Sequence, residues 1–504
     1  MKKRNVSKGI VSGLSLMLFL TACGGSNTAS SPSPSAAPGT STAPAAANAK
    51  EVELIWYFPQ AAVPADMKSV EAEANKLIKG KINATVKFMP VAFGDYTQKM
   101  NTIVASGEKV DLIWTSNWNF DYVQNQGKGA FIELDALIDK NAPEVKKSMP
   151  QFVWDGTKIN GKIYGIPNYQ TVTNREGFMI QKSYIDKLKI DVTKLKKIED
   201  LEPILAQIKQ DDASVTPFSM DYRGKFGNMN RSYNLENVIS EMAVISLSNP
   251  DKILNQYETP EYKQYLATAR SWFQKGYINQ DAATLKNLTA LNLSGKVITN
   301  FHNALKPGGE AETKVQFGGK DIVYVPITDV YTGTNTIITT LTAISRTSAN
   351  PDRAMQLINL VNTDKTLFNL LVYGIEGKHH SKNADGSVKV IKDGGYTVSD
   401  WVMGNVFNSQ VLEGKDPKVA EETKAQNESA KPSPIMGFKF QTTAVSAEIA
   451  NVKTVIDEYG PGLNTGTIDA KDKLPEFQEK LKKAGIDKVI AEAQKQLDEW
   501  KKTK

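Results

Sequence analysis

The alternation of apolar and polar positions first becomes regular at residue 52. Residues 52–58 form an apolar run that Pro59 ends, and this pattern predicts a buried strand. Apolar residues then recur with a helical period over 70–78 and are followed by Gly80, which predicts a helix that ends at this glycine.

The same two patterns then repeat. Apolar residues alternate over 82–88 as in a half-buried strand, and residues 110–114 form a third apolar run. Between them lies a helical stripe over 96–104, with Asp95 as its expected cap and Gly107 as its expected end. This order predicts an α/β fold, with helices on the faces of a parallel sheet.

Glycine and proline interrupt the pattern at three later places, 160–170, 322–327 and 374–378. Such interruptions suit segments in which a chain passes from one domain to another. A helix is expected to begin at Asn350, and the end of the chain predicts two more, which meet at Gly485.

The first 22 residues have a different character. Four basic residues among the first eight precede a short apolar run over 10–20, which is typical of a secretory signal peptide. Leu20-Thr21-Ala22-Cys23 matches the lipobox of bacterial lipoproteins, in which the cysteine takes a diacylglycerol and becomes the new N-terminus. We expect cleavage after residue 22 and a lipid anchor, with acyl chains such as palmitate, on Cys23 at the extracellular face of the cell membrane. An ordinary secretory cleavage site is the alternative.

Residues 24–49 contain only glycine, serine, asparagine, threonine, alanine and proline. Such a segment has too little apolar surface to build a core. With Cys23 it is predicted to form a disordered linker over 23–49, which would hold a folded body away from the membrane.

Charge and cysteine content argue against several classes of function. The chain has 61 Lys and Arg against 55 Asp and Glu, and 57 of the basic residues remain without the signal peptide, so the mature chain is nearly neutral. A nucleic-acid partner would normally show as a clustered basic face, so none is expected. Cys23 is the only cysteine, which argues against disulfides and thiol catalysis. The mature chain of about 480 residues is long enough for two or more domains.

Motifs for catalysis or cofactor binding are sparse. No glycine-rich phosphate loop opens a helix, so a nucleotide cofactor has no support. The three histidines, His302, His379 and His380, have no cysteine-rich or acidic ligand set beside them, and we expect hydrogen-bonded or solvated loop residues and no metal. The G-x-S-x-G context of a catalytic serine is absent. A glycoside hydrolase needs only two carboxylates and stays open as an alternative.

Large aromatic residues stand at the ends of two predicted strands, at 56–58 and within 114–119. Open α/β sheets bind ligands beyond the carboxyl ends of their strands. Aromatic rings stack on the C–H faces of sugars, while the interleaved Asn, Thr and Ser side chains can hydrogen-bond the hydroxyls. The pattern therefore indicates a sugar site, with Trp118 as a contact and with Trp56 and Phe58 in the core.

Several motifs, spread over nearly the whole mature chain, are shared with one known family. They are the lipobox, Lys81–Val86, Gly94-Asp95-Tyr96, Ser106-Gly107-Glu108, residues 160–170, Tyr373–His379, Gly437-Phe438 and Pro475-Glu476-Phe477. On these motifs the chain resembles the extracellular solute-binding proteins of ABC importers, carbohydrate type 1, and within them the LplA-like lipoprotein group. The resemblance also implies a C-terminal module at about 436–503.

The resemblance implies a two-lobed periplasmic-binding-protein fold, similar to type II, with a ligand cleft between the lobes. Lobe one would combine 50–166 with 328–375, and lobe two would combine 167–327 with 376–504. The chain would cross between the lobes at the three glycine- and proline-marked interruptions.

The resemblance further implies a lipid-anchored monomer that captures a carbohydrate, such as an oligosaccharide, and delivers it to a membrane permease. The ATPase of the importer would be a separate chain, and the protein itself would be no enzyme. A peptide or another modified nutrient is an alternative ligand, and an envelope-binding protein without a transport role is an alternative function.

The candidate ligand contacts are aromatic, amide and acidic side chains near the strand ends, the crossings and the second lobe. Asn168, Tyr169 and Gln170 lie at the first crossing, and Trp401 would wall the cleft on the side of lobe two. The full set is Tyr57, Trp114, Trp118, Asn168, Tyr169, Gln170, Asp221, Tyr222, Asn300, Glu376 and Trp401. No catalytic residue is expected.

Overall fold

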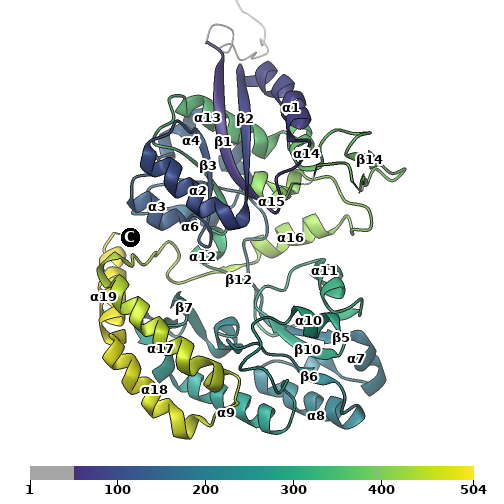
Figure 1. Ribbon diagram of the computed structural model, residues 1–504, viewed down its shortest axis with the longest axis vertical. Helices are drawn as coiled ribbons and strands as arrows, with labels where there is room; N and C mark the ends of the chain where they lie inside the picture. Colours follow the sequence, from purple (N-terminus) through teal and green to yellow (C-terminus); the bar gives the residue numbers. More distant parts are fainter. Residues whose placement is uncertain (1–49, 392, 397, 504) are drawn as a thin grey trace, which may run out of the picture. The chain divides into compact units, whose positions relative to one another are not determined.

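The computed structural model describes residues 50–391, 393–396 and 398–503. The predicted signal peptide, Cys23 and most of the predicted linker lie outside these residues. The chain from Ala49 on is one compact unit that contains two main sheets. The elements around each sheet are called the first lobe and the second lobe below (Figure 1).

The first lobe is built on a five-stranded sheet. Its order is β2 (Ala84–Ala92), β1 (Val52–Gln60), β3 (Leu112–Thr115), β13 (Leu341–Ile344) and β4 (Ile166–Pro167). β1 pairs with β2 and β3 in parallel, as the strand–helix rhythm predicts, whereas β13 pairs with β3 and β4 antiparallel. A strand from late in the sequence thus lies inside a sheet formed mostly by early residues.

Two helices connect the first three strands. α1 (Met67–Ile82) buries Val70, Ala74 and Ile78 but runs past Gly80 and ends at Asn83, whose φ of 47° is left-handed. A single glycine inside a helix costs only about 1 kcal/mol, too little to end it there. α2 (Phe93–Ser106) starts before Asp95, which therefore does not cap it, and ends at Gly107 (φ 70°) as expected.

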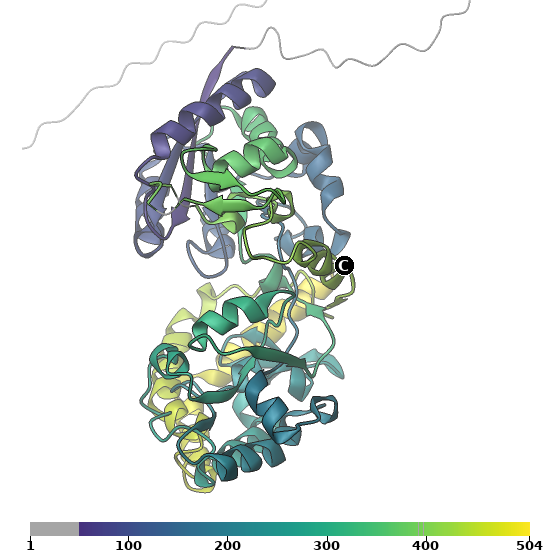
Figure 2. The ribbon, with the colours of Figure 1, turned by 90° about the vertical axis from the view of Figure 1, so that its right-hand side faces the viewer.

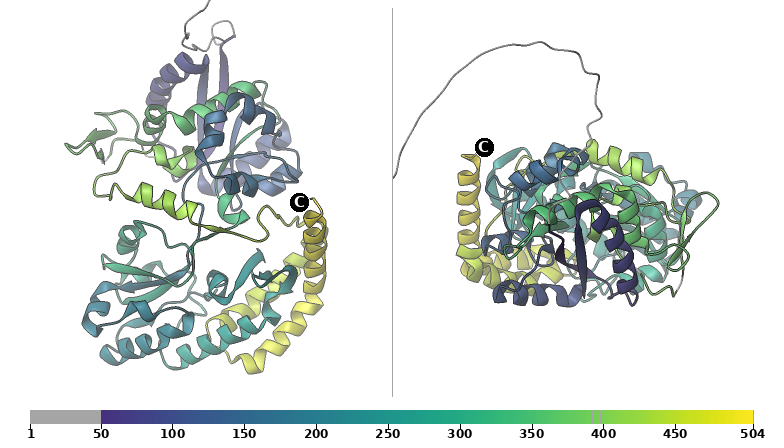
Figure 3. Two further views of the ribbon diagram at one scale, coloured as in Figure 1. Left: turned by 180° about the vertical axis from the view of Figure 1, so that it is seen from behind. Right: turned by 90° about the horizontal axis from the view of Figure 1, so that it is seen from above.

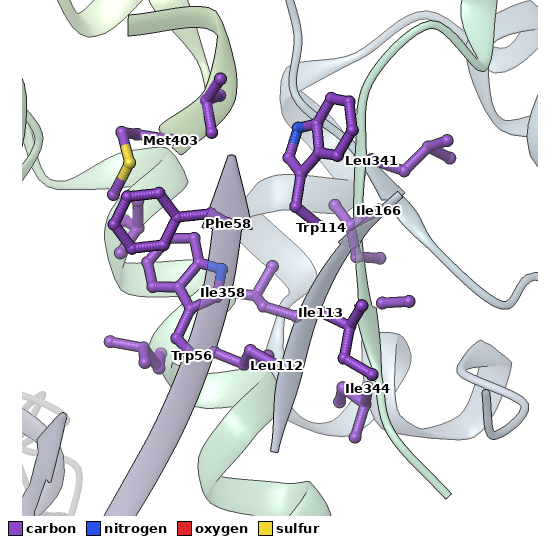
Figure 4. Packing of buried hydrophobic residues seen from close by; sticks show 14 of the residues in the cluster. Trp56, Phe58, Leu112, Ile113, Trp114, Ile166, Leu341, Ile344, Ile358 and Met403 are labelled. Carbon is purple, nitrogen blue, oxygen red and sulfur yellow. The ribbon is translucent and has the colours of Figure 1, made fainter. Parts of the chain in front are cut away.

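Further helices complete the first lobe. They are α3 (Tyr122–Gly127), α4 (Asp135–Asn141), α5 (Pro143–Ser148), α6 (Gln151–Thr157), α12 (Thr334–Ile337), α13 (Pro351–Thr363), α14 (Lys365–Tyr373) and α15 (Asp400–Met403). The core joins Trp114 with Leu341 and Ile166, and Phe58 with Met403 (Figure 4).

The hairpin β14 (His380–Lys382) and β15 (Val388–Val390) also belongs to the first lobe, which corrects one expectation. Val388, Tyr396, Val398, Val402 and Met403 are buried in the same core as β1 and β3. In Figure 2 the green residues of this part lie beside the purple N-terminal elements. Residues 376–412 were expected in lobe two, because the resemblance places a crossing directly after Gly374.

The second lobe contains a four-stranded sheet and an antiparallel three-stranded sheet. The first has the order β11 (Ile322–Pro326), β5 (Gly177–Gln181), β10 (Val297–His302) and β6 (Thr216–Phe218), and the second comprises β7 (Leu235–Ile239), β8 (Ala243–Ser246) and β9 (Asn249–Asn255). The helices of this part are α7 (Lys182–Leu188), α8 (Glu202–Asp211), α9 (Pro260–Gln274), α10 (Thr289–Leu293) and α11 (Gly309–Gln316).

Three C-terminal helices pack on the second lobe: α17 (Ser446–Asn464), α18 (Ala470–Ala484) and α19 (Ile486–Lys501). α18 and α19 meet at Gly485 (φ 100°), as the sequence predicts. Val452 and Phe477 are buried in the core of the second lobe. Figure 3 shows these yellow helices along the teal elements of this lobe. No helix in the described part of the chain is both long and apolar enough to cross a membrane.

Within the described residues, the chain passes between the lobes at 168–176, 327–333 and 413–434. These segments are bonded to one another: Asn174 and Tyr331 exchange backbone hydrogen bonds of 2.7 and 2.9 Å, and β12 (Tyr331–Thr332) pairs with β16 (Lys431–Pro432). α16 (Val419–Glu428) belongs to the third passage, and the Asn427 amide donates to the Gln170 carbonyl at 2.8 Å. The passages therefore form one narrow, hydrogen-bonded connection.

Candidate ligand-binding cleft

The carboxyl ends of parallel strands form one edge in each lobe. Phe93 follows β2 and Ser116–Asn119 follow β3, while Ser219–Asp221 follow β6, which pairs with β10 in parallel. Pro167 lies level with Thr115 in the first sheet, because both are paired with Leu341. Gly177 is paired with His302 in the second sheet. Residues 168–176 therefore join the two carboxyl edges directly, and these edges are where α/β sheets bind ligands.

Three aromatic side chains lie together at the edge of the first lobe, and we call Phe93, Trp118 and Trp401 the aromatic platform. Phe93 stacks on Trp401 with ring centroids 5.6 Å apart and an interplanar angle of 14°. Trp118 lies 6.2 Å from Trp401, donates its indole N–H to the Thr339 carbonyl at 2.9 Å, and remains 55% exposed. An exposed indole beside two partly buried rings offers an apolar surface on which a ligand can stack.

A cavity of about 530 Å³ has walls from both lobes, and Phe93, Trp118 and Trp401 are not among its lining residues. Its first-lobe wall includes Asn117, the neighbour of Trp118, whose amide donates to the Asn335 carbonyl at 2.9 Å. The remaining walls are mostly polar and come from the second lobe, the passages and the C-terminal part. They include Asn174, Glu176, Asn230, Arg231, Glu236, Asn237, Tyr331, Phe438, Lys439 and Gln441, whereas Gln124 of α3 belongs to the first-lobe wall.

Glu176 organises the polar wall where the first passage enters the second lobe. Its carboxylate accepts hydrogen bonds from the Arg231 N–H at 3.0 Å, the Ser232 N–H at 2.8 Å and the Tyr331 hydroxyl at 3.1 Å. Burial raises the pKa of Glu176, and the hydrogen bonds from Ser232 and Arg231 oppose that rise. The carboxylate therefore ties two passages to the second lobe.

Arg231 is held in place by a carboxylate and by an aromatic ring. Its guanidinium donates to Glu236 at 2.9 Å and lies 4.4 Å from the centroid of the Tyr331 ring. Burial raises the pKa of Glu236, while the positive charge of Arg231 lowers it. A guanidinium that is held by one carboxylate and one aromatic ring keeps further N–H donors for hydroxyl groups.

Asp400, the neighbour of Trp401, lies within electrostatic range of the second lobe. Burial raises the pKa of Asp400, and the positive charge of Lys306 opposes this rise. Lys306 follows β10 of the second lobe. Asp400 of the first lobe therefore lies near the end of β10, and Trp401 belongs to the first lobe and not, as expected, to the second.

Five of the predicted contacts are side chains that are at most 4% exposed. Tyr57 and Trp114 lie in the first core, where their carbonyls both accept from the Tyr96 hydroxyl. Tyr169 packs edge-on against Phe407, with centroids 5.0 Å apart. In this structure these rings have no face toward the cavity, because each lies one layer below the cleft surface.

Asn168 and Asn300 are buried for a different reason. The Asn168 amide donates to the carbonyls of Trp401 and Val402 at 3.1 and 2.7 Å, so it fixes the platform from below. Asn300 donates to the Ser219 hydroxyl at 2.7 Å and joins β10 to the segment after β6. Both amides support the walls of the cleft, and their contact with a ligand stays a prediction.

The other predicted residues are more accessible but do not meet at one place. Asp221 pairs with Arg223 at 2.8 Å and lines a separate cavity of about 420 Å³ in the second lobe, beside Tyr222. Gln170 is half-buried in the first passage. Glu376 is exposed and paired with Lys382 at 2.9 Å near the β14–β15 hairpin. Contact of these residues and of the platform with a ligand stays a prediction.

The three histidines are hydrogen-bonded, as the sequence predicts. His379 pairs with Asp66 at 2.8 Å, His380 donates to the Tyr373 carbonyl at 3.1 Å, and His302 accepts from the Ala304 N–H at 3.0 Å. Among the described residues, no three His, Cys, Asp or Glu side chains are grouped so that they could hold a metal.

Sequence reasoning missed Phe93, Glu176, Arg231, Glu236 and the part of the wall around Lys439. Phe93 directly follows a predicted strand, so the rule that located Trp118 could have found it. The other residues carry no local signal, because their neighbourhood depends on how the passages pack.

Comparison with known proteins identifies the class of this fold and cleft. Residues 61–366, more than half of the chain, match the family described as bacterial extracellular solute-binding proteins, so the chain belongs to this family of binding proteins. Residues 434–502 match a domain of unknown function, DUF3502. We call this part the C-terminal module.

Particular relatives are found in Streptococcus pneumoniae. A protein described as a carbohydrate ABC transporter substrate-binding protein is 32% identical over 450 residues, which cover 88% of this chain and 89% of the relative. A crystal structure of the N-glycan transport solute-binding protein NgtS is 30% identical, with a TM-score of 0.77, and covers 89% of this chain and 99% of that chain. The NgtS complex with Man5GlcNAc is 31% identical over 90% of this chain and 99% of that chain, with a TM-score of 0.64.

Proposed function

We propose that this protein captures an oligosaccharide in the cleft between its lobes and delivers it to the membrane permease of an ABC importer. The proposal rests on an exposed aromatic platform at the carboxyl edge of the first sheet and on a cavity between the lobes. The residues that line this cavity are mostly polar and include Asn117, the neighbour of Trp118. Aromatic rings stack on the C–H faces of sugars, and the amide, guanidinium and carboxylate groups serve the hydroxyls. The pneumococcal relatives are a carbohydrate ABC transporter substrate-binding protein and NgtS, which was crystallised with Man5GlcNAc. Both support the same class of ligand.

Closure of the two lobes over the ligand is part of this proposal. Two structures of one relative, NgtS, give TM-scores of 0.77 and 0.64 against this chain, so that protein adopts at least two conformations. A narrow connection of three bonded passages suits a hinge. We place the lobe boundaries at these passages, and the third of them lies after residue 412.

Anchoring through Cys23 is the second part of the proposal and rests on the lipobox, which lies outside the described residues. A lipid on Cys23 and the linker over 23–49 would keep the folded unit at the extracellular face of the membrane. The high local concentration of binder near its permease would then favour delivery. The importer's ATPase would be a separate chain, and the binder would act as a monomer.

The experiment that tests the function is calorimetric titration of the unit from Ala49 on with Man5GlcNAc and with unrelated oligosaccharides and peptides. We expect stoichiometric binding of at least one oligosaccharide and an increase in stability of about 2.7 kcal/mol at a hundredfold excess over Kd. Mass spectrometry after incubation should show intact sugar. Cleaved sugar would favour the glycoside hydrolase, and binding of peptides alone would overturn the carbohydrate proposal.

A further inference from the structure

The C-terminal module is fixed firmly to the second lobe. Val452 of α17 and Phe477 of α18 are part of the core of that lobe. On α19, the Gln494 side chain accepts from the Ile253 N–H of β9 at 2.7 Å. Ala493 and Leu497 pack with Ile253 in a small separate cluster. Any movement of the second lobe therefore carries the helices of the module with it.

One segment of the module also reaches the first lobe, and we call residues 437–441 the strap. The Lys439 ammonium donates to the carbonyls of Gly156 and Lys158, at 2.9 and 2.5 Å, at the C-terminal end of α6. The Gly437 N–H donates to the Thr334 hydroxyl at 2.8 Å. The strap is thus bonded to the first lobe through groups that the module itself provides.

The strap separates two cavities. Phe438, Lys439 and Gln441 line the cleft cavity of about 530 Å³ and also a second cavity of about 580 Å³ on the other side. The second cavity lies between residues 159–161 and α19. A ligand in the cleft that extended toward α19 would therefore meet the strap as a wall.

Asn230 lies in the same cleft cavity and has an unusual environment. The residue is only 4% exposed, yet neither its amide nitrogen nor its amide oxygen has a partner among the described residues. A buried polar group without a partner costs about 1–3 kcal/mol. The buried Asn168 amide, by contrast, is satisfied by three carbonyl and hydroxyl groups. Folding alone therefore gives no reason for an amide at position 230.

Asn237 on β7 also has one polar side-chain atom without a partner among the described residues. Its nitrogen donates to the Gly227 carbonyl at 3.3 Å, and the atom without a partner is its buried oxygen. Both asparagines line the cleft cavity, as does the strap. Turning the Asn230 amide toward the cavity breaks no hydrogen bond.

We propose that the strap and Asn230 form a subsite in which the amide of Asn230 hydrogen-bonds hydroxyl groups of a bound sugar and the strap closes that side of the cleft. This inference rests on the proposed function and gives the C-terminal module a role in ligand recognition. A sugar hydroxyl both donates and accepts, which matches an amide whose two polar atoms are unpaired.

The first test replaces Asn230 with leucine, which has a similar shape and no polar atoms. Asn230→Leu should bind Man5GlcNAc about tenfold more weakly, the loss of roughly one hydrogen bond. The melting temperature without sugar should stay unchanged or rise, because no internal hydrogen bond is lost. Asn168→Leu is the matched control, and its melting temperature should fall.

The outcomes of this test are distinguishable. If the native protein binds neither Man5GlcNAc nor any other oligosaccharide, both the proposed function and this inference fail. If the native protein binds sugar and Asn230→Leu binds it equally well, only the inference is overturned. A clear fall in the melting temperature of Asn230→Leu would also overturn it, since Asn230 would then have a structural role.

The second test concerns the strap. Lys439→Met removes both hydrogen bonds to the first lobe and should weaken binding of Man5GlcNAc about tenfold, mainly through faster dissociation. Lys483→Met is the matched control, because Lys483 is an exposed residue of α18 that pairs with Glu479 on the surface. Equal dissociation rates for the two variants, measured by surface plasmon resonance, would overturn the role of the strap.

Discussion

Phe93 stacks on Trp401 with ring centroids 5.6 Å apart, although one residue opens α2 and the other lies on α15. Both rings belong to the first lobe and, with Trp118, they make the aromatic surface of the cleft. The Asn168 amide supports this arrangement by donating to the Trp401 carbonyl at 3.1 Å. The platform is therefore assembled from three separate parts of the chain and is supported by a fourth.

Two tryptophans of this region should respond differently to truncation. Trp118→Ala removes an exposed ring and should lower the affinity for oligosaccharide about tenfold or more, with a loss of about 1 kcal/mol or less in apo stability. Trp114→Ala empties a fully buried site and should cost about 3–5 kcal/mol. Calorimetric titration and chemical denaturation measure both effects. Similar stability losses in the two variants would mark Trp118 as a core residue.

Lys439 should make stability depend on pH. Burial lowers the pKa of Lys439 from its ordinary value of 10.5 to about 7. Between these values the unfolded chain binds more protons than the native protein, so the contribution of Lys439 to stability rises with pH, by at most about 1.4 kcal/mol per unit. Below about 7 the amine is charged in both states and contributes no slope.

This pH dependence is measured by denaturation of the native protein and of Lys439→Met at pH values on both sides of 7. The free energy of unfolding of the native protein should increase relative to the variant as the pH rises above about 7. Parallel curves over the whole range would contradict the lowered pKa.

Ligand should also change the dimensions of the folded unit. If the lobes close about the three passages, the radius of gyration of the unit from Ala49 on should decrease when a bound oligosaccharide is added to saturation. Small-angle X-ray scattering measures this directly, and Trp118→Ala at the same sugar concentration is the weak-binding control. An unchanged radius at full occupancy would mean that the cleft binds without closing.

The anchor is tested by substitution of a single residue. Cys23→Ala removes the thiol that takes the diacylglycerol, so the variant should lose incorporation of labelled fatty acid and leave the membrane fraction. Thr21→Ala, which keeps the cysteine, is the control and should retain the label. A labelled Cys23→Ala protein would show that the lipid is attached elsewhere or that the lipobox was misidentified.

The sequence predicted the first three strands, the parallel sheet and the two terminal helices, because each follows from a periodic pattern within a short window. It also placed Trp56 and Phe58 correctly in the core. The pattern failed at Gly80, where burial of one helix face outweighs the small penalty of a glycine.

The site was harder to predict because its residues are brought together from distant segments. Asn168 and Tyr169 lie at a passage, as their position suggests, but residues 401–407 pack over them and bury both. No local pattern shows that coverage. Asn230 and Arg231 become part of a site only because they share a cavity with the passage that carries Glu176 and with the strap. The passage precedes them in the sequence and the strap follows them.

The position of β13 has a consequence for the order in which the protein is made. β13 lies between β3 and β4, so the first sheet stays open until residues 341–344 have left the ribosome. The four-stranded sheet of the second lobe needs nothing beyond Pro326. Until β13 has been synthesised, the apolar edge of β3 is exposed and vulnerable to wrong pairing. The lobe whose residues are synthesised first is thus the one whose sheet is completed last.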